Sequence, residues 1–334
     1  MKLKRLICTI LLVSMMFSLT SCRLLYQEKE LDHDELNESL EPIELQDDSS
    51  SNISPLLYKV TDDKGNVVWL FGSIHVGEED FYPLPDYVYD AFDLADSLAV
   101  ECDIVAFEKN IKAQTKALSM LVYNDGSTIK DYVSEEVYER AIEIIDDADK
   151  YVKVYDYYYP ILWSNLIDNF LIEKFDFDSE LGIDKHLLDM AYDEDKEILE
   201  VESIEFQYGM MAGFSMELQA ILLESSIEGY DDYKTSKKDL RKLLDAWKQG
   251  DEDAIIEILS DEPDELTPDE KILYEEYNEA MVVSRNISMT DYAEKALKSG
   301  KEVFICVGAA HVVGDDAMAD LLQERGYTVE VIRE

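Results

Sequence analysis

One local pattern occurs near both ends of the chain, and it constrains the fold more than any other feature. An unbroken apolar run at 67–71 precedes a Gly-Ser-Ile-His turn, and a second run at 303–307 precedes Gly-Ala-Ala-His. Apolar runs without alternation are typical of strands covered on both faces. After each turn we expect a helix and a second strand, at 86–96 and 97–101 in the first copy and at 317–325 and 327–332 in the second. The pattern predicts an α/β fold whose mixed sheet contains two strand-GxxH-helix-strand units.

The histidines of the two turns, His75 and His311, occupy equivalent places after their strands. Gly72 and Gly308 are expected to let the chain turn sharply there, so that each histidine projects from the sheet edge. In open α/β folds this edge commonly binds ligands, and a neutral imidazole offers a nitrogen to a metal or a proton. The repeat therefore predicts that both histidines serve one site.

A hairpin should open the folded domain, which we expect to span 56–334. The strand-like run at 56–60 is separated from the run at 67–71 by Asp, Lys, Gly and Asn residues, which favour a turn.

Between the two units, from about 105 to 298, the sequence predicts a large helical insertion. One strand, 198–201, interrupts it, and Gly300 is expected to cap its last helix. The tyrosines at 155 and 157–159 are expected to pack in the core and at its boundary, the alternative being that they line a groove. Apolar periodicity places helices near 133–147, 159–173, 183–192, 205–225, 238–247 and 270–298.

The first 21 residues have the features of a lipoprotein signal peptide. Basic residues at 2, 4 and 5 precede an apolar run ending at Leu19, which is short for a transmembrane helix. The sequence Leu19-Thr20-Ser21-Cys22 resembles a bacterial lipobox, so we expect Cys22 to be lipidated and to become the mature N-terminus. The alternative is an ordinary signal peptide with an incidental cysteine.

Residues 22–55 are rich in Asp, Glu, Ser and Asn and are expected to form an acidic flexible tether, with His33 a solvated side chain. The protein would then be an extracytoplasmic lipoprotein at the cell surface or in the periplasm. A net charge of −45 opposes attraction to anionic lipids, so membrane contact is expected through the N-terminal lipid only.

Composition excludes two classes of protein. A net charge of −45 would repel phosphate backbones, so we expect no nucleic-acid partner. Besides Cys22 and one cysteine in the signal, only Cys102 and Cys306 remain, which excludes a disulfide framework. Both sit in strand-like apolar runs and are expected to be buried thiols, although an exported protein could oxidise them.

A carboxylate accompanies the two histidines. Glu101 ends the strand that follows the first histidine turn, so its side chain should lie at the same sheet edge. Two imidazoles and one carboxylate, with one coordination position left for water, suffice for a hydrolytic metal site. We therefore expect His75, Glu101 and His311 to bind a divalent transition metal, with Glu101 also able to act as a base.

Two further polar residues are candidates for catalysis. Glu202 closes the short strand of the insertion and could act as a second carboxylate. Arg285, on the penultimate predicted helix, could stabilise an oxyanion or fix a substrate carboxylate. His186 lies in a helical pattern beside two leucines and is interpreted as structural.

These motifs resemble the TraB/PrgY/GumN family, which includes the animal Tiki metalloproteases that cleave Wnt proteins. The resemblance covers about residues 56–334, leaving out the signal and the tether. Ser203 stands where a threonine is common, which removes no proposed ligand. The matching segments are Trp69-Leu70-Phe71-Gly72-Ser73-Ile74-His75, Glu101, Gly182-Ile183-Asp184, Glu202-Ser203 with Gln207, Arg285-Asn286, and Val307-Gly308-Ala309-Ala310-His311 through Gly314.

The resemblance implies an α/β domain with a helical insertion and a metal-dependent, peptidase-like centre, with His75, His311 and Glu101 as the matching residues. We accordingly expect a membrane-anchored hydrolase that uses Mn, Co or Zn to act on a peptide or protein substrate. Because other branches of the family are linked to shutdown of peptide pheromone signalling, a non-catalytic peptide- or ligand-binding lipoprotein is the main alternative. A metal-assisted esterase is a further one.

Overall fold

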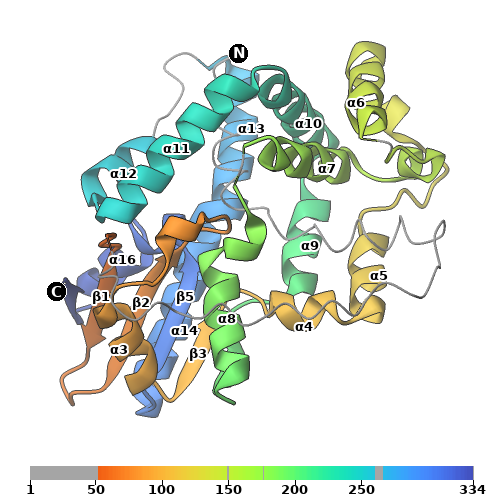
Figure 1. Ribbon diagram of the computed structural model, residues 1–334. Helices are drawn as coiled ribbons and strands as arrows, with labels where there is room; N and C mark the ends of the chain where they lie inside the picture. Colours follow the sequence, from red (N-terminus) through yellow and green to blue (C-terminus); the bar gives the residue numbers. More distant parts are fainter. Residues whose placement is uncertain (1–51, 149, 176, 260–265, 334) are drawn as a thin grey trace, which may run out of the picture.

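The computed structural model describes residues 52–148, 150–175, 177–259 and 266–333 (Figure 1). The expected signal peptide, Cys22 and most of the expected tether lie outside these residues. Two residues assigned to the tether do pack against the domain: Ile53 is buried, and the Ser54 amide donates to the Lys248 carbonyl at 2.6 Å. Contacts with the domain therefore begin a few residues before position 56.

A six-stranded mixed sheet forms the centre of the domain, with strand order β4-β3-β5-β2-β1-β6. The strands β2, β5, β3 and β4 run parallel to one another, whereas β1 pairs antiparallel with β2 and with β6. This arrangement confirms the expected mixed sheet and the opening hairpin. The strand bounds are Leu57–Thr61 (β1), Val67–Ser73 (β2), Ser97–Val100 (β3), Glu197–Glu200 (β4), Val303–Gly308 (β5) and Thr328–Ile332 (β6).

Helices cover both faces of the sheet, which explains the unbroken apolar runs in β2 and β5. On one face, side chains such as Phe71 and Phe304 pack against α3 (Asp86–Leu94) and α8 (Ile183–Asp193), which lie in front of the sheet in Figure 1. On the other face, alternate residues such as Leu70 pack against α14 (Ser284–Ser299) and α16 (Met318–Glu324). Alternate side chains of each central strand thus enter two separate cores.

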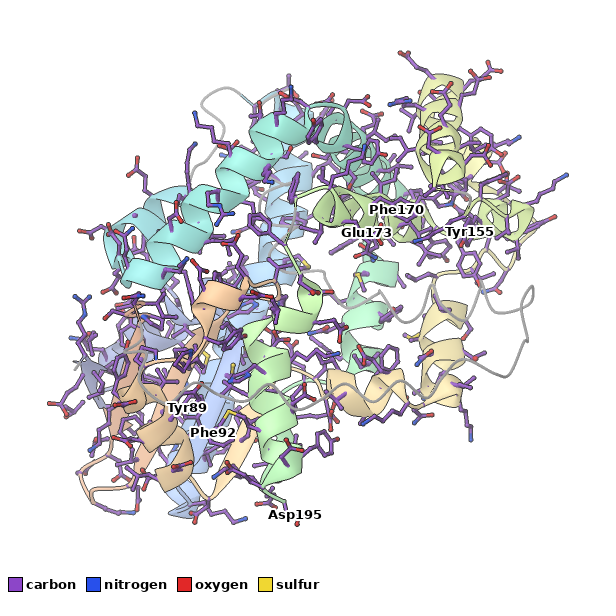
Figure 2. All side chains as sticks on the ribbon, viewed as in Figure 1. Tyr89, Phe92, Tyr155, Phe170, Glu173 and Asp195 are labelled. Atoms are coloured by element: carbon purple, nitrogen blue, oxygen red, sulfur yellow. The ribbon has the colours of Figure 1, made fainter. Side chains whose placement is uncertain are left out.

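The rest of the insertion is a helical lobe beside the sheet. Its most extensive helix–helix contact is between α7 and α10. Its aromatic residues, such as Tyr155 and Phe170, lie far from Phe92 of α3, the helix that packs on the sheet (Figure 2). The remaining helices are α4 (Ile104–Glu108), α5 (Ile111–Ser119), α6 (Glu135–Asp147), α7 (Pro160–Glu173), α9 (Ile204–Gly213), α10 (Met216–Asp231), α11 (Tyr233–Gln249), α12 (Glu252–Leu259), α13 (Pro268–Asn278) and α15 (Ala309–Val312), with 3-10 turns at Glu79–Phe81, Ile129–Asp131, Lys153–Tyr157 and Ser179–Leu181.

Several expected elements need correction. The insertion is not wholly separate from the sheet, because α8, β4 and α14 belong to the layers of the sandwich. The helix expected at 205–225 is two helices, because Ser215 caps a new one by accepting from the Leu218 amide. The helices α4, α5, α12 and α15 were not expected. Gly300 does end α14 in the left-handed conformation, with φ of 76°.

The tyrosine run is divided between core and surface, since Tyr155 is buried and Tyr157 is exposed. Cys102 and Cys306 are buried free thiols, as expected. Within the described ranges, no helix combines the length and the apolar character needed to cross a membrane.

Candidate active site

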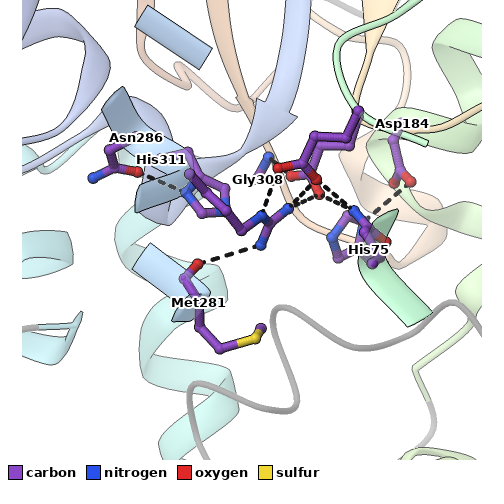
Figure 3. A network of polar contacts seen from close by, with 10 residues as sticks. His75, Asp184, Met281, Asn286, Gly308 and His311 are labelled. Carbon is purple, nitrogen blue, oxygen red and sulfur yellow. Dashed lines mark hydrogen bonds and ion pairs between the residues drawn. The ribbon is translucent and has the colours of Figure 1, made fainter. Parts of the chain in front are cut away.

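The predicted site residues meet at the carboxyl ends of three neighbouring strands. In the parallel pair β2 and β5, Ser73 lies opposite Gly308, so His75 and His311 both leave the sheet at the same edge. Glu101 directly follows β3, which pairs with the other side of β5. Figure 3 shows His75 and His311 on opposite sides of Gly308. The topology therefore brings together the three residues that the sequence analysis proposed as metal ligands.

The two motif glycines serve a different purpose from the one we expected. Neither Gly72 nor Gly308 is among the left-handed glycines of the described residues, so the backbone conformation at these positions does not itself require glycine. Instead, each leaves space that a side chain would fill. A Cβ at Gly72 would lie 2.9 Å from Ala309 Cα, and a Cβ at Gly308 would lie 3.2 Å from Glu101 Oε1. The glycines permit the close approach of strand ends and of the site carboxylate.

Glu101 is buried and fully engaged at the centre of the site. Its Oε1 accepts from the Gly308 amide at 2.7 Å, and its Oε2 accepts from Arg285 at 2.6 Å and from Gln207 at 3.1 Å. Burial raises the pKa of Glu101, but the Arg285 guanidinium, with smaller contributions from both histidines, outweighs burial and lowers the pKa to about 2. Glu101 is therefore a carboxylate at neutral pH.

Arg285 is held between two carboxylates. Its Nε and Nη2 donate to the two oxygens of Glu202 at 2.8 and 2.9 Å, and Nη2 also donates to Glu101. The third nitrogen, Nη1, donates to the Met281 carbonyl at 3.3 Å (Figure 3). Met281 lies in a π-helical turn at Glu279–Val283. Burial alone would lower the pKa of Arg285, but the carboxylates of Glu101 and Glu202 have the larger effect and raise it above its ordinary value. The guanidinium therefore stays charged.

His75 is paired with Asp184, a residue of α8. Its Nδ1 lies 3.0 Å from Asp184 Oδ2. The loop carrying His75 is tied to the start of α8, because the Ile183 amide donates to the Ile74 carbonyl at 3.0 Å, and a Cβ at Gly182 would lie 2.8 Å from the His75 carbonyl oxygen. Burial lowers the pKa of His75, but the Asp184 carboxylate more than offsets this and leaves the pKa above its ordinary value.

His311 has a neutral partner instead. Its Nδ1 lies 2.7 Å from Asn286 Oδ1, and Asn286 in turn donates from Nδ2 to the Asp316 carbonyl at 3.0 Å. Burial, together with the positive charge of Arg285, lowers the pKa of His311 to about 3. At neutral pH this imidazole is therefore uncharged.

The imidazoles of His75 and His311 and the carboxylate of Glu101 are ligand types that bind divalent transition metals. Among the described residues, however, no three His, Cys, Asp or Glu side chains are already arranged to hold a metal ion. Nδ1 of each histidine faces an acceptor oxygen, to which it donates, as in most metal-binding histidines, and this leaves Nε2 as the nitrogen suited to the metal. Glu101 Oε1 accepts one hydrogen bond in this region and has a second lone pair. The carboxylates of Glu101 and Glu202 also face a single guanidinium, that of Arg285, a charge balance that favours an added cation.

Three functional contacts escaped the sequence analysis. Asp184, Asn286 and Gln207 were noted only as parts of matching motifs, without a role, yet each bonds directly to a site residue. Their positions close in sequence to Gly182, Arg285 and Glu202, within the same motifs, could have indicated a role in the site. His186, by contrast, packs against Tyr82 with ring centroids 4.4 Å apart and ring planes tilted by 45°, in keeping with a structural role.

Comparison with known families gives one match. A sequence model of the TraB/PrgY/gumN family matches residues 56–331, which is most of the chain and all of the sheet except the last residue of β6. Searches of curated proteins and of solved structures gave no match. The matched range contains both Gly-x-x-His motifs, Glu101 and Arg285. The chain belongs to the TraB/PrgY/gumN family.

Proposed function

We propose that this chain is a membrane-anchored, extracytoplasmic hydrolase that uses a divalent transition metal, Mn, Co or Zn, to cleave peptide bonds. The observation that carries the proposal is the convergence of two buried imidazoles and a buried carboxylate at one edge of the sheet. Each imidazole has its Nδ1 hydrogen-bonded, which suits coordination through Nε2.

When bound, the metal would supply a Lewis acid that activates water near neutral pH. His75, His311 and Glu101 would hold it. Glu101 is also the residue suited to accept a proton, because its low pKa keeps it ionised and its Oε1 retains a lone pair.

Arg285 is suited to bind the carbonyl oxygen of the substrate. A guanidinium has five N–H donors, and the contacts with Glu101, Glu202 and the Met281 carbonyl use four of them. The fifth, on Nη1, remains to stabilise negative charge on that oxygen. Both oxygens of Glu202 accept from the guanidinium, at Nε and Nη2, so Glu202 acts through Arg285 instead of on the substrate.

The location rests on the N-terminal sequence. Signal-like residues 1–21 and the lipobox cysteine Cys22 support a lipid anchor outside the cytoplasm, followed by an acidic segment that would hold the domain away from the membrane. A peptide or protein at the cell surface or in the periplasm would then be the substrate.

One observation favours the alternative of a non-catalytic peptide-binding protein. Arg285 Nη2 lies 2.6 Å from Glu101, and an arginine that permanently occupies this carboxylate would compete with a metal. In that case the site would bind its ligand without turnover.

A cleavage assay separates the two functions. The full chain is incubated with a mixed peptide library in Mn, Co or Zn, and new termini are read by mass spectrometry. We expect cleavage that His75→Ala abolishes and that His186→Ala, at a half-buried histidine outside the site, preserves. Intact peptides in all three metals would contradict the peptidase and leave the binding protein.

A further inference from the structure

The two motif histidines differ in the residue behind each ring, despite their matching places in the repeat. We propose that Asp184 and Asn286 are positioning residues that fix both imidazoles in the Nδ1-protonated form and make His75 the stronger of the two metal ligands. The ring orientations are a property of the chain itself. The affinity difference rests on the proposed function.

A chain of hydrogen bonds leading away from the site determines the form of His311. Asn286 donates from Nδ2 to the Asp316 carbonyl at 3.0 Å, which orients its amide and turns Oδ1 toward the ring. An amide oxygen only accepts, so His311 Nδ1 must carry the proton over the 2.7 Å contact. His311 therefore keeps its lone pair on Nε2.

The carbonyl that orients Asn286 is itself placed by an unusual backbone conformation. Asp316 has a φ of 60°, one of two non-glycine residues with positive φ in the described ranges. Such conformations are uncommon outside glycine and cluster at functional sites. The Asp316 amide is bonded to Asp320 Oδ2 at 3.2 Å, which stabilises the turn. The conformation has an evident use here, because it directs a carbonyl at the residue that holds His311.

His75 is fixed by a carboxylate. An ionised Asp184 can only accept, so the 3.0 Å contact requires a proton on His75 Nδ1. The other oxygen of Asp184, Oδ1, is buried without a hydrogen-bond partner among the described residues. A buried carboxylate oxygen without a donor is costly, and the contact with His75 is the evident reason to keep Asp184 there.

The two partners should affect the metal unequally. A carboxylate behind an imidazole increases its basicity as a ligand, whereas the neutral amide of Asn286 mainly orients the ring. Loss of such partners typically weakens metal binding by about tenfold to a hundredfold. We expect the loss of metal affinity to be near a hundredfold in Asp184→Ala and near tenfold in Asn286→Ala.

Two measurements on the full chain test the proposal. Long-range 15N–1H spectra of the metal-free protein report which ring nitrogen of each histidine carries the proton. Both His75 and His311 should be protonated on Nδ1; Asp184→Ala should alter only the His75 pattern and Asn286→Ala only the His311 pattern. His186, which faces Tyr89 through Nε2 at 3.4 Å, is the internal control in both variants.

Calorimetric titration with Mn, Co or Zn then gives the affinities. Asp184→Asn retains an acceptor oxygen without the charge, so it should keep the His75 tautomer and recover part of the affinity lost in Asp184→Ala. Wild-type histidines protonated on Nε2, or variants that bind metal as tightly as the wild type, would overturn the proposal. A wild type that binds no metal would overturn the proposed function together with the affinity ranking, and the spectra would still decide whether the two residues position the rings.

Discussion

Replacing Asp168 by asparagine should change how the stability of the protein depends on pH. Asp168 lies in α7 and is 7 % exposed, and neither of its carboxylate oxygens has a hydrogen-bond partner of good geometry in the described residues. Burial raises the pKa of Asp168 to about 7, while the nearby Ser226 hydroxyl acts in the opposite direction. The folded protein therefore keeps a proton on this group that the unfolded chain releases near pH 4.

The sign and size of the effect follow from proton linkage. Because the folded-state pKa exceeds the unfolded one, the stabilisation is complete below pH 4 and is lost as pH rises toward 7. A pKa of about 7 in place of 3.8 corresponds to roughly 4 kcal/mol over the whole range. Between pH 5 and pH 8 the free energy of unfolding of the wild type should fall by about 3 kcal/mol relative to that of Asp168→Asn, whose side chain does not titrate.

Urea unfolding at pH 5 and pH 8 measures this difference directly. Asp156→Asn is the matched control, because Asp156 is equally buried at 7 % but accepts from Tyr138 at 2.9 Å and from Tyr151 at 3.1 Å. Asparagine keeps an acceptor oxygen for the two tyrosines but is an uncharged and weaker acceptor, so this change should lower the free energy of unfolding by about 1–3 kcal/mol at both pH values. A wild type and an Asp168→Asn variant whose stabilities change in parallel between pH 5 and 8 would refute the reasoning.

Two further substitutions test the site. Arg285→Lys removes the paired contact with Glu202 and should lower the free energy of unfolding by about 3 kcal/mol, because buried ion pairs are costly to break. Urea unfolding measures this change, and an unchanged midpoint would show that the ion pair does not stabilise the fold. Gly308→Ala puts a methyl group 3.2 Å from Glu101 Oε1 and should slow peptide cleavage by about tenfold to a hundredfold. Its control is Gly213→Ala, where a Cβ meets no atom within 4 Å and the same assay should detect no change; equal rates in both variants would contradict the role given to Gly308.

The position of the site could be predicted from sequence because it depends on strand ends. Apolar runs identify β2 and β5, and parallel neighbours necessarily end at one edge, so His75 and His311 converge without knowledge of any side-chain contact. Glu101 follows by the same reasoning from β3.

The partners of these residues could not be predicted in this way. Asp184 reaches His75 only because a turn places Gly182 against the chain at His75, which depends on the packing of α8 on the sheet. Asn286 reaches His311 from α14, which directly follows a π-helical turn, and no periodicity in the sequence indicates that turn. Likewise, the role of Gly308 is set by the distance to Glu101, a residue 207 positions away.

Isothermal titration of the full chain with Mn, Co and Zn tests the central claim most directly. The proposed site predicts one metal ion per chain, with binding lost in His75→Ala and in His311→Ala but retained in His186→Ala. The absence of binding by the wild type, or equal binding by all four proteins, would contradict a metal centre formed by these two histidines.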